Sequence, residues 1–165
     1  FKIAKQLGLQ NEQAEGLTMA AFVHDIGKIL VQADILSKPG SLTKAEYDML
    51  KDHCRIGFEI LKNIEFPWPI ATIVLQHHER IDGSGYPAGI RGEEILLEAR
   101  ILAVADVVEA MSSNRPYRPS LGLEKALEEI SHGAGTLYDP DAVRACLAAF
   151  RKNRFNFEGS RGAHL

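Results

Sequence analysis

The sequence lacks most of the features that would set it apart from an ordinary globular domain. Only two cysteines occur in 165 residues, so no disulfide framework is available and a reducing compartment is the default. No run of about 18 apolar residues and no signal-peptide pattern occurs, which predicts a cytoplasmic protein. Lysine and arginine number 19 against 22 acidic residues, so the net charge provides no basic face for DNA.

Segments with the two-residue period of a strand, internal repeats and low-complexity tracts are also missing. Apolar residues recur instead at helical spacing, which predicts an all-α fold built around one core. Thr43 and Glu46 fit a capping box, and Asp139 before Pro140 fits a helix start. Residues 95–111 are apolar nearly all round and are expected to form a central helix. The expected helices cover residues 1–9, 12–28, 43–61, 67–79, 95–111, 123–131 and 139–151.

One apolar helical run carries an imidazole, a carboxylate and an ammonium within five residues, at His24, Asp25 and Lys28. Burying such groups costs several kcal/mol unless each finds a partner, and a metal ion can serve a neighbouring His and Asp. Comparable donors occur elsewhere in predicted helices. The candidate metal ligands are His24, Asp25, His53, His77, His78 and Asp106.

Each of these residues has a simpler interpretation when taken alone. A single histidine on an apolar face is usually a satisfied core residue, and His77-His78 would suit the dipole at a helix C-terminus. Asp106 is harder to explain, because a buried carboxylate needs an arginine or a metal. Cys54 follows His53, but a small buried hydrophobe is the simpler interpretation of that thiol.

Four imidazoles and two carboxylates exceed the needs of one tetrahedral site and favour two ions with open positions. Asp25 is the candidate bridging ligand. Mixed nitrogen and oxygen donors favour iron or manganese, while zinc, nickel and magnesium stay open. Such a centre would hydrolyse a phosphodiester by attack of a metal-bridged hydroxide. Asp25 and Lys28 are therefore the candidate catalytic residues, with Lys28 holding a phosphate oxygen.

Two loops are candidates for substrate contact. Arg115 and Arg118 could clamp a second phosphate bidentately, although a solvated basic loop has the same appearance. The glycines of Asp82-Gly83-Ser84-Gly85-Tyr86-Pro87 allow close approach of the backbone to a ligand, and Tyr86 provides a stacking or hydrogen-bonding group. A bare surface turn would look the same.

Taken together, these motifs resemble the HD-GYP domains of bacterial signalling proteins. The resemblance rests on His24-Asp25-Ile26-Gly27-Lys28, His53, His77-His78-Glu79-Arg80-Ile81-Asp82-Gly83-Ser84-Gly85-Tyr86-Pro87, Asp106, Asn114-Arg115-Pro116-Tyr117-Arg118-Pro119, and Gly133-Ala134-Gly135-Thr136 with Asp139-Pro140. It implies a single helical domain over residues 1–153, with a centre of two or three metal ions, frequently iron, in the middle of the bundle. It also implies hydrolysis of cyclic di-GMP to pGpG and often on to GMP.

The same resemblance assigns roles to residues. The six candidate ligands above correspond to metal ligands, and Lys28 lies at the metals and the substrate phosphate. Arg115 and Arg118 correspond to phosphate contacts. Asp82 and Tyr86 belong to the loop that faces ligand, or a partner such as a diguanylate cyclase or an adaptor protein through Gly85-Tyr86-Pro87.

One departure from the family pattern concerns the start of the chain. The family usually has a further metal-binding histidine upstream, with a glutamate one turn before it in trinuclear members, and residues 1–23 contain no histidine. We therefore expect that portion of helix before Phe1, and beyond it an upstream regulatory domain. Residues 154–165 are expected to be a polar tail, and a homodimer is left open.

Two alternative functions stay open at this point. One keeps the metal centre and changes the substrate to cyclic GMP-AMP or another nucleotide, because the purine pocket cannot be identified from the sequence. The other is a catalytically inactive interaction module, which would bind no metal and show no turnover.

Overall fold

The computed structural model describes residues 1–114 and 120–153, and this part of the chain is helical with no named strand, which confirms the all-α prediction. The described residues form nine α-helices and two 3₁₀ segments, which are joined by short loops. The elements are α1 (Lys2–Gln6), α2 (Asn11–Val23), η1 (Ile26–Leu30), α3 (Ala33–Leu36), α4 (Lys44–Lys51), α5 (His53–Leu61), α6 (Ile70–Gln76), η2 (Gly92–Glu94), α7 (Leu97–Ser112), α8 (Leu123–His132) and α9 (Pro140–Asn153).

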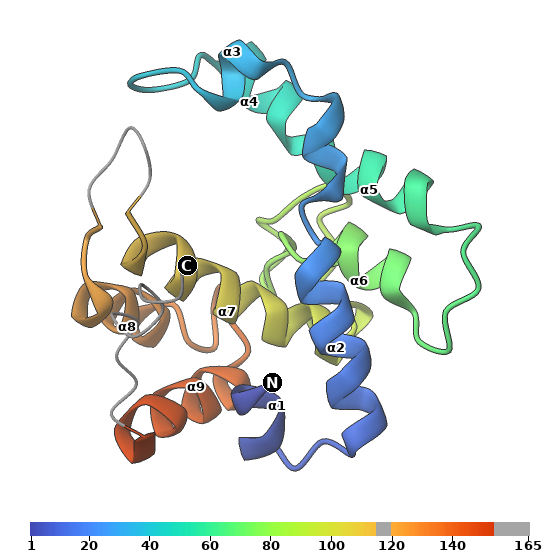
Figure 1. Cartoon of the computed structure of the whole chain (residues 1–165). Helices are drawn as coiled ribbons and strands as arrows, with labels where there is room; N and C mark the ends of the chain where they lie inside the picture. Colours follow the sequence, from blue (N-terminus) through green and yellow to red (C-terminus); the bar gives the residue numbers. More distant parts are fainter. Residues whose placement is uncertain (115–119, 154–165) are drawn as a thin grey trace, which may run out of the picture.

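Helix α7 runs through the middle of the molecule and contacts α1, α2, α6, α8 and α9 (Figure 1). Its sequence is apolar nearly all round because it has neighbours on several sides. The buried residues of α7 are Ala99, Ile101, Leu102, Ala103, Val104 and Val108. The prediction of a central helix in this segment is confirmed, and its bounds differ from the expected ones by one or two residues.

The helix expected over residues 12–28 is shorter than predicted. Helix α2 ends at Val23, and the chain turns at Asp25 before the 3₁₀ segment η1 begins. Gly27 in that segment packs so closely on α5 that an added Cβ would lie 2.0 Å from the carbonyl oxygen of His53. Only glycine allows this approach, which brings the turn at Asp25 against the first residue of α5.

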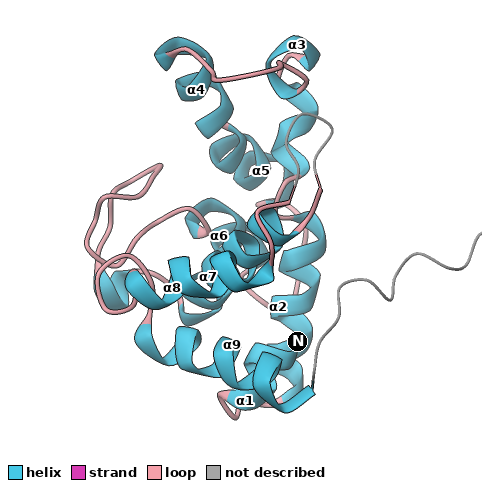
Figure 2. Ribbon diagram, turned by 90° about the vertical axis from the view of Figure 1, so that its left-hand side faces the viewer, coloured by secondary structure: helices cyan, strands magenta, loops and turns pink. Residues whose placement is uncertain are grey.

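The helix expected over residues 43–61 consists of two helices, α4 and α5, which meet at Asp52. The capping box is confirmed, because the Glu46 N–H donates to Thr43 Oγ1 at 3.3 Å and the Thr43 N–H donates to Glu46 Oε2 at 2.7 Å. His53 is therefore the first residue of a helix. Figures 1 and 2 show α3 and α4 at one end of the molecule, away from α8 and α9.

The remaining helices agree with the predictions to within a few residues. Helix α6 begins at Ile70 after the prolines at positions 67 and 69, and α9 begins at Pro140. Asp139 caps α9 as predicted, because its Oδ1 accepts the N–H groups of Asp141 and Ala142, each at 2.9 Å.

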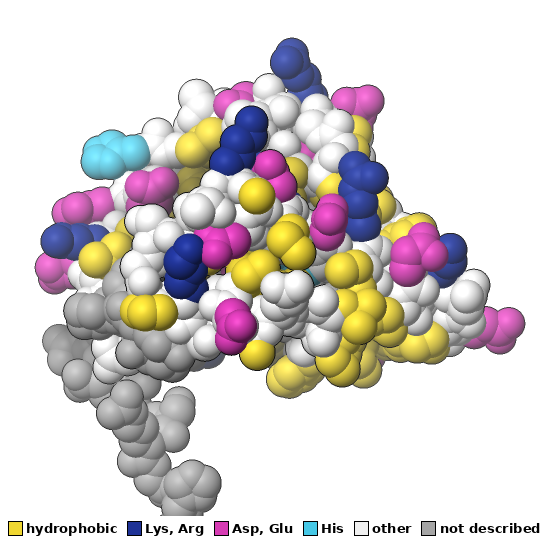
Figure 3. Space-filling view, turned by 90° about the horizontal axis from the view of Figure 1, so that it is seen from above, with side chains coloured by type: hydrophobic (Ala, Val, Ile, Leu, Met, Phe, Trp, Pro, Cys, Tyr) yellow, Lys and Arg dark blue, Asp and Glu magenta, His cyan; other side chains and the backbone are white. Residues whose placement is uncertain are grey.

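The surface over the α3–α4 end carries both charged and apolar side chains, with the apolar ones gathered toward one edge (Figure 3). Phe22, Ile29 and Leu30 are each at least 70% exposed. None of the described helices has the length and apolarity needed to cross a membrane.

Candidate metal centre

Three histidines are held by the same local device. In each, the ring Nδ1 is hydrogen-bonded to the carbonyl oxygen three residues earlier, so Nδ1 carries the proton and Nε2 presents a lone pair. This is the usual way in which a protein orients an imidazole toward a metal. The bonds join His24 to Ala21 (2.8 Å), His53 to Leu50 (2.7 Å) and His77 to Val74 (2.6 Å).

The histidines converge from separate elements. His24 follows α2, His53 begins α5, and His77 and His78 follow α6. The Nε2 atoms of His53 and His77 lie 3.4 Å apart. Two nitrogens bound to one tetrahedral ion at about 2.0–2.1 Å would be separated by about 3.4 Å. The spacing therefore fits a shared ion.

The Asp25 carboxylate lies in the middle of this group. Its Oδ2 accepts a hydrogen bond from Lys28 Nζ at 2.6 Å and lies 3.5 Å from His24 Nε2. Its Oδ1 lies 3.6 Å from His53 Nε2 and is buried with no hydrogen-bond partner among the described residues. An unsatisfied buried carboxylate oxygen is costly, and a cation at this point would satisfy it. The residues therefore fit a metal ion.

Asp106 reaches the same centre from α7, with its Oδ1 at 3.6 Å from His24 Nε2. Burial alone would raise the pKa of Asp106, but the nearby imidazoles of His24 and His78 hold that pKa below its usual range. The carboxylate is therefore ionised. Burial alone would likewise lower the pKa of His24, yet the nearby carboxylates of Asp106 and Asp25 raise it overall.

The two adjacent histidines are in the form that binds metals. Burial, opposed only in part by the bond to the Val74 carbonyl, lowers the pKa of His77 to about 4. Burial and the neighbouring His77 lower the pKa of His78 to about 2. Both imidazoles are therefore neutral near pH 7, as metal coordination requires.

Tyr86 is positioned against this centre by its own loop. Its ring lies 4.8 Å from that of His78, at an interplanar angle of 30°, and its N–H donates to the His78 carbonyl at 3.2 Å. Gly85 allows the loop to lie on the preceding chain, because an added Cβ would lie 2.3 Å from the Arg80 nitrogen. The loop is therefore packed beside a candidate ligand.

Glu79 holds the end of this loop by hydrogen bonds, a role that was not predicted from the sequence. Its buried carboxylate accepts the N–H groups of Ala88 at 2.7 Å and Gly89 at 3.0 Å. The available signal was its position directly after His77-His78, where an acidic residue in a buried segment needs partners.

The other predicted substrate residues have different outcomes. Asp82 is exposed, and its Oδ1 accepts bonds from the N–H of Ser84 at 2.9 Å and the hydroxyl of Ser84 at 2.7 Å. It forms a local turn, and its substrate role stays a prediction. Arg115 and Arg118 lie outside the described residues.

The structure brings together two groups of donor atoms, each within 4.8 Å of one another. One comprises His24, Asp25 and His77. The other comprises His53, Cys54, His77 and His78, so it adds a thiol that the sequence analysis set aside as a hydrophobe. The geometry supports a divalent metal site at the centre of the helical domain.

The chain matches the HD domain family over residues 1–142. It is 48% identical over 147 residues to the cyclic di-GMP phosphodiesterase response regulator RpfG of Xanthomonas campestris pv. campestris, covering 88% of this chain and 39% of that protein. It is 39% identical over 150 residues to the 3′3′-cGAMP-specific phosphodiesterase 3 of Vibrio cholerae, covering 91% of this chain and 32% of that protein.

A solved structure, the HD-GYP-type protein Bd1817 of Bdellovibrio bacteriovorus, has a TM-score of 0.73 at 18% identity, covering 91% of this chain and 48% of that one. The chain belongs to the HD domain family. Within it, the motifs and the relatives show that this is an HD-GYP domain. The chain spans about two fifths or less of the length of these two curated relatives.

Proposed function

We propose that this domain is a metal-dependent phosphodiesterase that hydrolyses cyclic di-GMP to pGpG and further to GMP. The observation that carries the proposal is the centre in which three oriented imidazoles meet a buried Asp25 oxygen that has no hydrogen-bond partner in residues 1–114 and 120–153. A relative with 48% identity is named a cyclic di-GMP phosphodiesterase, which supports the choice of substrate.

In this proposal the centre holds two divalent ions, preferably iron or manganese. A third ion would need donors beyond the proposed set. Two ions bring about +4 and two carboxylates about −2, so a positive surplus remains for a phosphate. The proposed ligands are His24, Asp25, His53, His77, His78 and Asp106.

The side chains around the centre bind and orient the substrate. Lys28 Nζ, now on Asp25 Oδ2 at 2.6 Å, is close enough to the centre to be shared with a phosphate oxygen. Arg115 and Arg118 hold the second phosphate, while Tyr86 and Asp82 face the substrate from their loop. When bound, the ions supply Lewis acidity and a source of hydroxide near neutral pH. Water is added across one P–O bond, and the leaving sugar oxygen takes a proton.

Cyclic GMP-AMP is the second candidate substrate. The observation in its favour is the 39% identity to a relative named as a 3′3′-cGAMP-specific enzyme. Both substrates present two phosphodiesters in a ring and differ only in one base, so the metal centre serves either. The base-contacting residues decide between them.

Parallel assays test the function. The chain is loaded anaerobically with ferrous iron or manganese, and hydrolysis of cyclic di-GMP and 3′3′-cGAMP is followed by separation of the nucleotides. We expect faster turnover of cyclic di-GMP, which chelation of the metal abolishes. Metal-loaded protein that hydrolyses neither substrate would contradict the proposal. Protein that binds no metal and hydrolyses neither substrate would favour the interaction module, in which the Gly85-Tyr86-Pro87 loop binds a diguanylate cyclase or an adaptor.

The domain boundary and further partners belong to the same proposal. The domain extends to residue 153, the end of α9. An upstream regulatory domain would control access to the centre, and a homodimer is tested by light scattering of the purified protein.

A further inference from the structure

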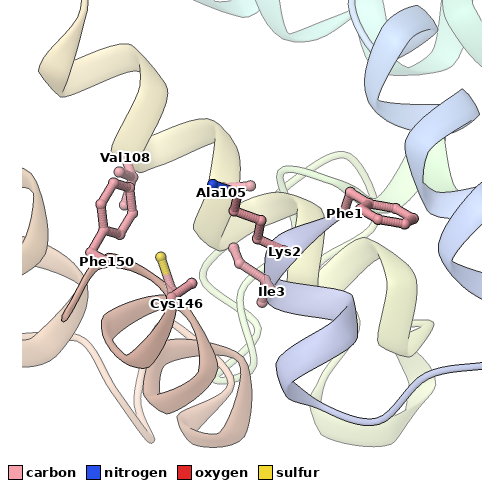
Figure 4. Close-up of a pocket in the computed structure, with 8 residues that line it drawn as sticks. Phe1, Lys2, Ile3, Ala105, Val108, Cys146 and Phe150 are labelled. Atoms are coloured by element: carbon pink, nitrogen blue, oxygen red, sulfur yellow. The ribbon is translucent and has the colours of Figure 1, made fainter. Parts of the chain in front are cut away.

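The two cysteines are both fully or almost fully buried, but their surroundings differ. Cys146 on α9 belongs to the main apolar cluster and lines an apolar pocket of about 450 Å³ with Val108 and Phe150 (Figure 4). Cys54 is absent from that cluster. It lies in the first turn of α5, directly after His53, with 0% of its surface exposed.

The Cys54 sulfur lies among the imidazole nitrogens. Its Sγ is 3.6 Å from His53 Nε2, the same nitrogen that lies 3.4 Å from His77 Nε2. A sulfur at about 2.3 Å and a nitrogen at about 2.0–2.1 Å from one tetrahedral ion would be separated by about 3.5 Å. Both measured spacings therefore fit ligands of one ion.

The remaining donors of this group lie close to the same point. Ligand atoms of His53, Cys54, His77 and His78 all lie within 4.8 Å of one another. The ring of His78 lies 5.1 Å from that of His53 and 4.1 Å from that of His77. Three nitrogens and one sulfur make up a ligand set that is typical of zinc.

We propose that the Cys54 sulfur is a direct ligand of one of the two ions, together with His53, His77 and His78. The inference rests on the proposed metal centre and makes it chemically asymmetric. The ion at Cys54 has soft and borderline ligands and favours zinc or ferrous iron over manganese and magnesium. The ion at Asp25 and Asp106 has harder oxygen ligands. On binding, the Cys54 S–H bond breaks, its proton passes to water, and no electron is transferred.

Cys146 provides a matched control. Both thiols are buried, with 0% of Cys54 and 1% of Cys146 exposed, so the two cysteines differ mainly in their neighbours. Cys146→Ser therefore reports the effect of losing any buried thiol, while Cys54→Ser reports the effect of losing this one at the centre.

X-ray absorption of the zinc-loaded chain tests the inference directly. We expect a sulfur scatterer at about 2.3 Å from zinc in the wild type and in Cys146→Ser, and its loss in Cys54→Ser. Cobalt(II) substitution should give a sulfur-to-metal charge-transfer band with the same pattern. Zinc affinity should fall at least about tenfold in Cys54→Ser, while manganese affinity stays nearly unchanged.

The outcomes separate this inference from the proposed function. Zinc bound by nitrogen and oxygen alone in the wild type, with cyclic di-GMP still hydrolysed, overturns the role of Cys54 and leaves the phosphodiesterase intact. Failure of the wild type to bind any of these ions overturns both. If Cys54→Ser does not fold, the wild-type spectrum still decides, because the sulfur signal is either present or absent.

Discussion

Two aspartates, the buried Asp139 and the half-buried Asp25, have very different hydrogen-bond partners. Asp139 uses both oxygens, since Oδ1 accepts two backbone N–H groups at 2.9 Å and Oδ2 accepts Arg100 Nη1 from α7 at 2.7 Å. Asp25 uses Oδ2 for Lys28 and leaves Oδ1 buried without a partner among the described residues.

This contrast separates a structural polar group from a functional one. Both oxygens of Asp139 have partners from the protein itself and tie α9 to α7, so the Asp139 carboxylate is satisfied, although Arg100 Nε is buried with no hydrogen-bond partner among the described residues. The Asp25 cluster can still bind a cation, because its imidazoles present Nε2 lone pairs and Asp25 Oδ1 accepts no hydrogen bond from the described residues. Proteins depart from full internal satisfaction mainly where a ligand completes the set.

The largest effect, on the free energy of unfolding, is expected from removing the Asp139 carboxylate. Asp139→Ala removes a helix cap and leaves Arg100 partly buried without its carboxylate, which should lower the free energy of unfolding by about 3–5 kcal/mol. Urea denaturation measures this change. The exposed Asp141 on the same helix provides the control, and Asp141→Ala should cost less than about 1 kcal/mol. Similar losses in both variants would show that Asp139 is not a buried anchor.

The next effect comes from removing charge from the Asp25 cluster. Asp25→Asn should lower metal affinity and turnover at least about a hundredfold, since loss of an outer-shell partner alone costs about 10–100-fold. Urea unfolding of the metal-free protein should change by less than about 1 kcal/mol, because the Lys28–Asp25 pair is partly exposed and Asp25 Oδ1 has no hydrogen-bond partner within the described part of the chain. Calorimetric titration with manganese measures the affinity. Unchanged affinity would remove Asp25 from the centre.

A smaller effect is expected at Glu79, which holds the Tyr86 loop in place beside the Asp25 cluster. Glu79→Gln replaces the carboxylate that holds the N–H groups of Ala88 and Gly89, so the Tyr86 loop should loosen beside His78. We expect kcat/KM to fall about tenfold, with stability reduced by about 1 kcal/mol. The exposed Glu93 is the control, and Glu93→Gln should match the wild type in both measurements.

The smallest effect concerns a pair far from both Asp25 and Asp139. The hydrogen bond from Lys38 and those from Thr43 lower the pKa of Glu46 from 4.5 to about 2. The folded carboxylate therefore contributes stability above about pH 4.5, and this contribution is lost as the pH falls toward 2. Comparing urea unfolding at pH 6 and pH 3 should show a slightly weaker pH dependence in Glu46→Gln. The same change in the free energy of unfolding between the two pH values in both proteins would contradict the lowered pKa of Glu46.

The sequence predicted those features whose causes are local. The capping box of Thr43 and Glu46, the cap at Asp139 and the all-round apolar pattern of α7 depend on residues within a few positions of one another. The breaks after Val23 and at Asp52 were missed. The break after Val23 is followed by the close packing of Gly27 on the His53 carbonyl. These two residues are 26 positions apart, and hydrophobic periodicity does not predict a contact over that separation.

For the candidate centre, the residue types alone indicated which side chains needed partners, because buried imidazoles and carboxylates are expensive when isolated. Only the tertiary structure decided how they meet. The packing of α5 on η1 and α6 sets the 3.4 Å between the Nε2 atoms of His53 and His77 and brings the Cys54 sulfur among the nitrogens. It also leaves one Asp25 oxygen with no hydrogen-bond partner as far as the structure describes the chain. Distances between such separate segments follow from packing across the whole domain, and the order of residues along the chain does not contain them.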